Sequence, residues 1–184
     1  MKTAIRVCLL GLIGCFVPAL LGADEENPLK KAKVGDWVEY KMTGTNNVAG
    51  KTKMVVIAKD DKEVTYEITG TFSFMGKETV APVQKQTVDL TKPYDPAVAA
   101  ANLKATNTKI EKTGEGKEKL KVGEKEFDTK WTKLKSTTTV NNITIVSEYQ
   151  MWFAANVPLS GLVRLDTTAP GVKTKLELVG SGSK

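Results

Sequence analysis

The chain has 184 residues, a formal net charge of +6, two cysteines and no histidine. The absence of histidine excludes Ser-His-Asp and Cys-His catalysis, imidazole acid–base chemistry and nearly every zinc or copper site. Both cysteines, Cys8 and Cys15, lie at the start of the chain, so the remainder offers no disulfide, thiol nucleophile or thiolate ligand. We therefore expect a protein without catalytic residues, bound metal or cofactor.

The first 23 residues have the order of a secretory signal peptide. A basic stretch, Met1 to Arg6, precedes an apolar run from Val7 to Leu21, and the chain becomes acidic at Asp24. The apolar run is shorter than the roughly 20 residues of a membrane-spanning helix. We predict cleavage after Ala23 and export to the periplasm or the medium.

A second interpretation of the same segment stays open. The residues before Cys15 resemble the lipobox of bacterial lipoproteins, in which the cysteine is lipidated and becomes the new N-terminus. The apolar run continues to Leu21, past the cysteine, whereas a lipoprotein normally becomes polar there. Secretion is therefore the preferred prediction, and lipidation of Cys15, with envelope association, is the alternative.

Cleavage leaves 161 residues with a net charge of +4, because Lys2 and Arg6 are removed. This length predicts one domain over residues 24–179, with a flexible tail at 180–184. Nearly all of the positive charge is lysine, and Arg164 is the one arginine that remains. Lysines that alternate with Thr and Glu indicate a solvated sheet face, and nucleic-acid binders favour Arg, so we expect no nucleic-acid partner.

The first half of this domain alternates apolar and polar residues with period two, which predicts strands. Asn27-Pro28 is placed like the cap and first turn of a short helix. Pro82 marks an edge strand or a bulge. The expected strands cover residues 34–42, 51–59, 63–72 and 78–90, with turns at 44–47, 60–61 and 74–77.

A short helix is expected over Ala97 to Leu103, capped by Asp95 with Pro96 at its first position. Beyond it, Gly114-Glu115-Gly116 has the composition of a turn. The expected strands of this half cover residues 106–112, 117–122, 125–135, 143–153, 162–168 and 172–179. Short strands separated by Gly, Pro and Asn turns predict an all-β, mainly antiparallel fold, as a curved sheet or half-barrel with one short helix.

The aromatic side chains are the candidate binding residues. On a concave sheet face they would line a site for a lipid or other amphipathic ligand. The ligand-facing candidates are Trp37, Tyr66, Phe72, Trp131 and Tyr149. In the alternative, these residues form an ordinary core, and the protein is a structural or protein-interaction module without a small-molecule site. The aspartates lack the spacing of calcium loops, so we expect them in turns and caps.

Three runs resemble a group of uncharacterised exported proteins of planctomycete-type bacteria: Val34 to Tyr40, Leu120 to Trp131, and Trp152 to Val163. More distantly, their pattern resembles the half-barrel envelope proteins typified by the lipoprotein carrier LolA. That resemblance implies a strongly bent antiparallel sheet that closes over short helices and holds acyl chains. The carrier group has an arginine in its cavity, and this chain offers only Arg164 for that place. The sequence does not define the oligomeric state.

Overall fold

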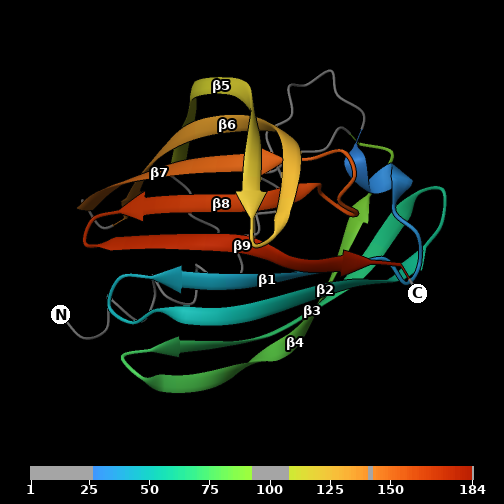
Figure 1. Cartoon of the computed structure of the whole chain (residues 1–184), viewed down its shortest axis with the longest axis horizontal. Helices are drawn as coiled ribbons and strands as arrows, with labels where there is room; N and C mark the ends of the chain where they lie inside the picture. Colours follow the sequence, from blue (N-terminus) through green and yellow to red (C-terminus); the bar gives the residue numbers. More distant parts are fainter. Residues whose placement is uncertain (1–26, 93–107, 141–142, 184) are drawn as a thin grey trace.

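The structure of the protein is a computed structural model that describes residues 27–92, 108–140 and 143–183 (Figure 1). Its regular elements are one short 3-10 helix and nine strands. They are η1 (Pro28–Lys31), β1 (Trp37–Gly44), β2 (Ala49–Lys59), β3 (Glu63–Phe74), β4 (Lys77–Asp89), β5 (Thr108–Val122), β6 (Lys125–Val140), β7 (Ile143–Phe153), β8 (Leu162–Ala169) and β9 (Val172–Gly182).

All nine strands belong to one antiparallel sheet with the order β4-β3-β2-β1-β9-β8-β7-β6-β5. Two meanders, β1 to β4 and β5 to β9, are joined where β1 pairs with β9. The sheet is open and curved, with β4 and β5 at its edges (Figure 1). The predicted all-β antiparallel fold is therefore confirmed. The signal peptide, with Ala23 and Cys15, and the expected helix at 97–103 lie outside the described residues.

The predicted turn at Asn27-Pro28 is the helix η1. The Asn27 side chain accepts a hydrogen bond from the Leu29 amide at 3.0 Å, and Pro28 occupies the first helical position, where its missing amide proton costs nothing. Leu29 is buried and projects into the main core. The cap therefore fixes the position of Leu29, through which η1 contributes to the core.

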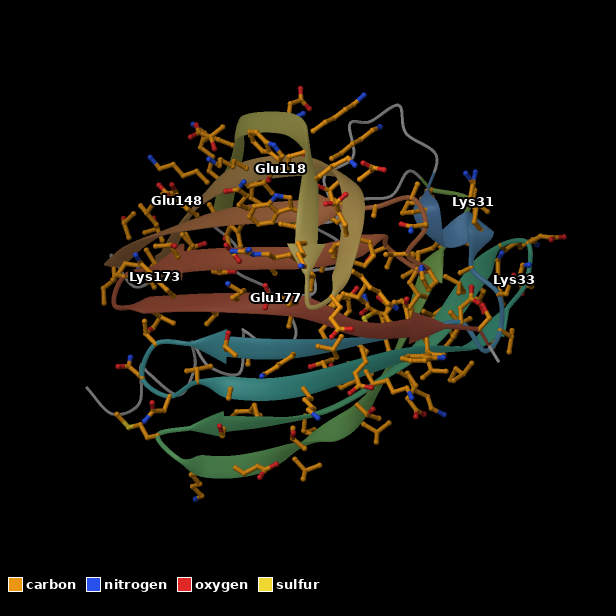
Figure 2. All side chains as sticks on the ribbon, viewed as in Figure 1. Lys31, Lys33, Glu118, Glu148, Lys173 and Glu177 are labelled. Carbon is orange, nitrogen blue, oxygen red and sulfur yellow. The ribbon has the colours of Figure 1, made fainter. Side chains whose placement is uncertain are left out.

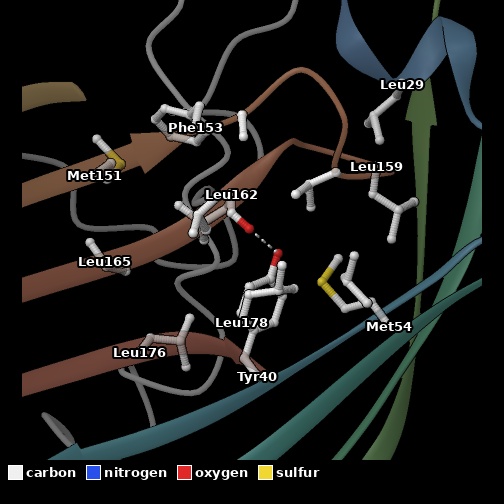
Figure 3. Close-up of a cluster of buried hydrophobic side chains, with 14 of the residues drawn as sticks. Leu29, Tyr40, Met54, Met151, Phe153, Leu159, Leu162, Leu165, Leu176 and Leu178 are labelled. Atoms are coloured by element: carbon white, nitrogen blue, oxygen red, sulfur yellow. Dashed lines mark hydrogen bonds between the residues drawn. The ribbon is translucent and has the colours of Figure 1, made fainter. Parts of the chain in front are cut away.

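One face of the sheet, here called the core face, carries the main hydrophobic core. Side chains of β1, β2 and β7–β9, together with Leu29 and Leu159, point into this core (Figure 3). Tyr40 is fully buried there, and its hydroxyl donates to the Leu162 carbonyl at 3.0 Å. The opposite face, here called the outer face, carries Trp37, Trp131 and most of the charged side chains of these strands.

Two glycines on the core face allow the backbones of β2 and β3 to approach each other closely. A Cβ on Gly50 would lie 2.6 Å from the Thr71 carbonyl oxygen, and a Cβ on Gly70 would lie 2.4 Å from that of Lys51. No other residue tolerates such an approach, and glycines in strand interiors often mark places where another backbone comes close.

The structure corrects two expectations for glycine-rich segments. Gly114 to Gly116, expected as a turn, lies within the continuous strand β5, and Gly180 to Gly182, expected in a flexible tail, forms the end of β9. In both places the glycines pair with a neighbouring strand, and a tryptophan of that strand lies over them. Local composition signalled flexibility, whereas the cross-strand tryptophan fixes the segment.

Candidate functional site

The five aromatic residues predicted to face a ligand lie on two different faces. Tyr66 is buried on the core face, where Tyr149 packs against the core and Phe72 lies half-buried opposite Gly50. Trp37 and Trp131 are half-buried on the outer face. The structure therefore does not bring these five side chains together into one site.

The core face is filled by the protein's own side chains at the positions where a ligand was expected. Tyr66 is 2% exposed and Tyr40 is 0% exposed. Burial raises the pKa of Tyr66 to about 12, because the phenolate is disfavoured away from water. Both phenols therefore behave as structural core residues.

Trp37 lies flat across two glycines of the adjacent strand β9. A Cβ on Gly180 would lie 3.1 Å from atoms at the benzo end of the indole, and a Cβ on Gly182 would lie 3.1 Å from its nitrogen. One ring therefore spans both residues, parallel to the sheet. The missing side chains of the two glycines provide the space that the indole occupies.

Trp131 has the same arrangement on β5. A Cβ on Gly116 would lie 2.8–2.9 Å from three atoms around the indole nitrogen, and a Cβ on Gly114 would lie 3.4 Å from the benzo end. We call these two units, Trp37 on Gly180 and Gly182 and Trp131 on Gly114 and Gly116, the tryptophan platforms.

The two platforms are equivalent in register as well as in shape. Trp37 is the direct cross-strand partner of Gly182, and Trp131 is the direct partner of Gly116. In each case a register shift comes immediately before the first glycine, between Leu178 and Gly180 in β9 and between Lys112 and Gly114 in β5. A bulge increases the local twist and re-aims the following side chains. The same backbone device therefore appears twice on the outer face.

A lysine ammonium lies over the outer side of each platform. Lys53 Nζ is 4.6 Å from the centre of the Trp37 ring, and Lys133 Nζ is 5.4 Å from that of Trp131. Both distances are within the range of a cation–π interaction. Each indole thus has backbone beneath it and a lysine ammonium above it.

A charged cluster separates the platforms. Cross-strand pairs form one row from Trp131 through Trp152 and Arg164 to Glu177. The Arg164 guanidinium lies over the Trp152 ring at 4.9 Å and makes two hydrogen bonds to Asp166, at 2.8 and 2.5 Å. These hydrogen bonds raise the pKa of Arg164. Arg164 therefore lies on the outer face, not among the core residues where a carrier's cavity arginine was expected.

The curl of the sheet brings the two glycine-bearing strands toward each other. β5 and β9 are four strands apart in the sheet order, yet some of their Cα atoms lie within 8 Å, as the hairpin β5–β6 folds over the outer face (Figure 1). The Trp152 indole nitrogen donates to Glu118 of β5. Figure 2 marks Glu118 on this hairpin and Glu177 on β9, at opposite ends of the cluster. This hydrogen bond holds the curled hairpin to β7.

Sequence reasoning found both platform tryptophans but missed their glycines. The signal was present as a Gly-x-Gly triplet in each of two strands, at 114–116 and 180–182. Residues i and i+2 of a strand share a face, so such a triplet leaves a bare strip that a large cross-strand side chain can fill. Without the pairing of β1 with β9, nothing in the sequence connects Trp37 to residues 180–182.

No group of three or more acidic, histidine or cysteine side chains among the described residues is arranged to hold a metal ion. In the same part of the chain, no helix has the length and hydrophobicity needed to cross a membrane.

Comparison with known proteins shows that this chain is similar to solved structures in fold alone. No protein-family profile and no curated protein sequence matches the chain. A solved structure from Bacteroides fragilis, of a protein assigned as exported and with a YmcC-like fold, matches with a TM-score of 0.52 and 9% identity over 83% of this chain and 97% of that one. A protein of Parabacteroides distasonis assigned as a lipoprotein matches with a TM-score of 0.47 and 11% identity, over 86% of this chain and 100% of that one.

Proposed function

We propose that this protein is an exported, non-catalytic binding module that acts through the outer face of its sheet. The observation that carries the proposal is the pair of tryptophan platforms, which hold two half-buried indoles flat on the outer face. Tryptophan is enriched at binding surfaces because its rigid ring offers a large contact area at little cost in conformational entropy. Each ring is only half-buried, so part of it remains open to a ligand on the outer face.

Export is supported by the N-terminal segment, with its basic start, apolar run and small residues before Asp24. The similarly folded Bacteroides fragilis protein is itself assigned as exported. Mass spectrometry of the mature N-terminus tests this part of the proposal: a first residue at Asp24 is expected, and a diacylated Cys15 would instead place the module on a lipid anchor.

A second candidate function is binding of an apolar or amphipathic ligand on the core face. It is favoured by the apolar side chains that this face carries on strands from β1 to β9. Native mass spectrometry of the purified protein, followed by solvent extraction, separates the two candidates. We expect no co-purifying lipid and no binding of a fluorescent fatty acid, because Tyr40, Tyr66 and their neighbours are buried by protein. A stoichiometric lipid would favour the core face.

The outer face is tested with a panel of acidic polysaccharides, neutral polysaccharides, anionic vesicles and neutral vesicles. We expect at least one class to bind the wild-type protein. The affinity of the double variant Trp37→Leu/Trp131→Leu for that class should be lower by a factor of about ten or more. Met75→Ala is the control, since Met75 is an exposed apolar residue in the β3–β4 turn, away from both platforms. Binding of no class, or equal binding by the double variant, would overturn the proposal.

A further inference from the structure

We infer that the tryptophan platforms bind an acidic polysaccharide, whose sugar rings lie on the indoles and whose carboxylates meet the two lysines. The inference rests on the proposed function of the outer face and names its ligand class. Its grounds are the orientation of the two rings, the cation over each ring, and the presence of two equivalent sites on one face.

The orientation of the rings suits a sugar. A pyranose ring has one face of axial C–H bonds, which carry partial positive charge and stack on the electron-rich face of an aromatic ring. Such stacking needs an indole that lies parallel to the surface and is held there. Gly180 and Gly182 beneath Trp37, and Gly116 beneath Trp131, meet this need, because the backbone lies directly below each ring.

The lysines determine the charge of the preferred ligand. Lys133 is exposed and Lys53 is half-buried, and each has its ammonium over a ring. At an exposed site such as that of Lys133, a cation–π contact is weak enough for a flexible lysine to move off the ring when a sugar arrives. The displaced ammonium then lies beside the bound sugar, where it can pair with a carboxylate on that sugar.

The neighbouring acidic groups leave room for such a ligand. Asp166 is engaged by Arg164 through two hydrogen bonds, and Glu118 accepts from Trp152. Glu177 lies 4.0 Å from Arg164 and 3.8 Å from Lys175. Asp166 and Glu177 are therefore paired with cations, whereas Glu118 keeps its charge, and the row continues from Glu177 to Lys41 on β1.

Two sites on one face favour a polymer over a single sugar. The strands that back the platforms, β5 and β9, approach each other as the sheet curls. A chain of sugars that reaches both indoles gains from effective concentration, because the second contact becomes intramolecular once the first is made. A monosaccharide gains nothing from the second platform.

The test uses polygalacturonate, alginate and hyaluronate as acidic probes, with dextran as the neutral probe, followed by calorimetry and by indole fluorescence. We expect the acidic polymers to bind and to quench indole emission. Trp37→Leu and Trp131→Leu should each weaken binding about tenfold. Lys53→Gln/Lys133→Gln should remove the preference for acidic over neutral polymer, as should roughly 1 M salt, where the Debye length falls to about 3 Å.

Each possible result decides between the inference and the proposed function. Failure of all three acidic polymers to bind, or full binding by the lysine double variant, overturns the inference. Binding of dextran or of anionic vesicles that the tryptophan variants abolish overturns the acidic-polysaccharide inference but leaves the binding role of the outer face intact. A wild-type response in Met75→Ala, with unchanged far-UV circular dichroism in every variant, shows that the losses are local.

Discussion

Gly116→Ala and Gly114→Ala form a matched pair of substitutions that tests whether the Trp131 platform is rigid. Both glycines lie on β5, two residues apart on the same face, and both become alanine. The new Cβ at Gly116 would lie 2.8–2.9 Å from three atoms of the Trp131 ring, which is inside van der Waals contact. The new Cβ at Gly114 would lie 3.4 Å from the ring, which is an ordinary contact.

The two substitutions should therefore differ in sign. Overpacking costs about 1–3 kcal/mol, and replacing a strand glycine by alanine returns about 0.5–1 kcal/mol in conformational entropy. Gly116→Ala should lose on the order of 1 kcal/mol, and Gly114→Ala should gain roughly 0.5 kcal/mol. In a domain of this size, 1 kcal/mol shifts the melting temperature by about 2–4 °C.

Urea unfolding followed by far-UV circular dichroism measures the difference without using Trp131 as its own reporter. The indole emission of Gly116→Ala should also change, because the ring must leave its position. In a Trp131→Leu background the cost of Gly116→Ala should disappear, as a double-mutant cycle would show. Equal effects of the two substitutions, or a cost that persists without the indole, would refute the rigid platform.

Three further predictions concern the core and the charged cluster. Tyr40→Phe should lose about 1–3 kcal/mol in urea unfolding, because the buried Leu162 carbonyl loses its donor; no loss would show that the hydrogen bond is dispensable. Stability should fall as pH rises from about 10 toward 12, because burial raises the pKa of Tyr40 and Tyr66 in the folded protein above that in the unfolded chain. The double variant Tyr40→Phe/Tyr66→Phe should show a smaller fall in a pH series of melting temperatures. Arg164→Lys should lose about 1–2 kcal/mol in urea unfolding, because an ammonium lacks the planar fork that pairs with both Asp166 oxygens and lies flat over the Trp152 indole; wild-type stability would contradict this.

Period-two patterning was enough to predict most of the strands. In β3, Val64, Tyr66 and Ile68 alternate with polar residues, and all three are buried. Pro82 was expected in an edge strand or at a bulge, and it lies in β4, which is an edge strand with a register shift opposite Ile68 and Gly70. Such predictions succeed because alternation and the missing amide proton of proline act locally, whatever strand lies alongside.

Period-two patterning predicted only part of the candidate site. Trp37 and Tyr66 both belong to strands with clear alternation. Alternation shows which residues of one strand share a face, but it does not show which face of a neighbouring strand lies on the same side of the sheet. Gly180 looked like part of a flexible tail because glycine is permissive when nothing contacts it. Here Trp37, which is 143 positions earlier in the sequence, lies over it.

The sequence by itself determined the all-β class, the alternation of each strand and the absence of histidine and cysteine chemistry from residues 24–184, because these depend on composition and on neighbours along the chain. Only the tertiary structure decided that β1 pairs with β9, that Trp37 and Trp131 lie on the face opposite Tyr66, and that each indole rests on a Gly-x-Gly strip. Those features depend on contacts between segments far apart in the chain, and a Gly-x-Gly triplet does not say which tryptophan fills the space above it.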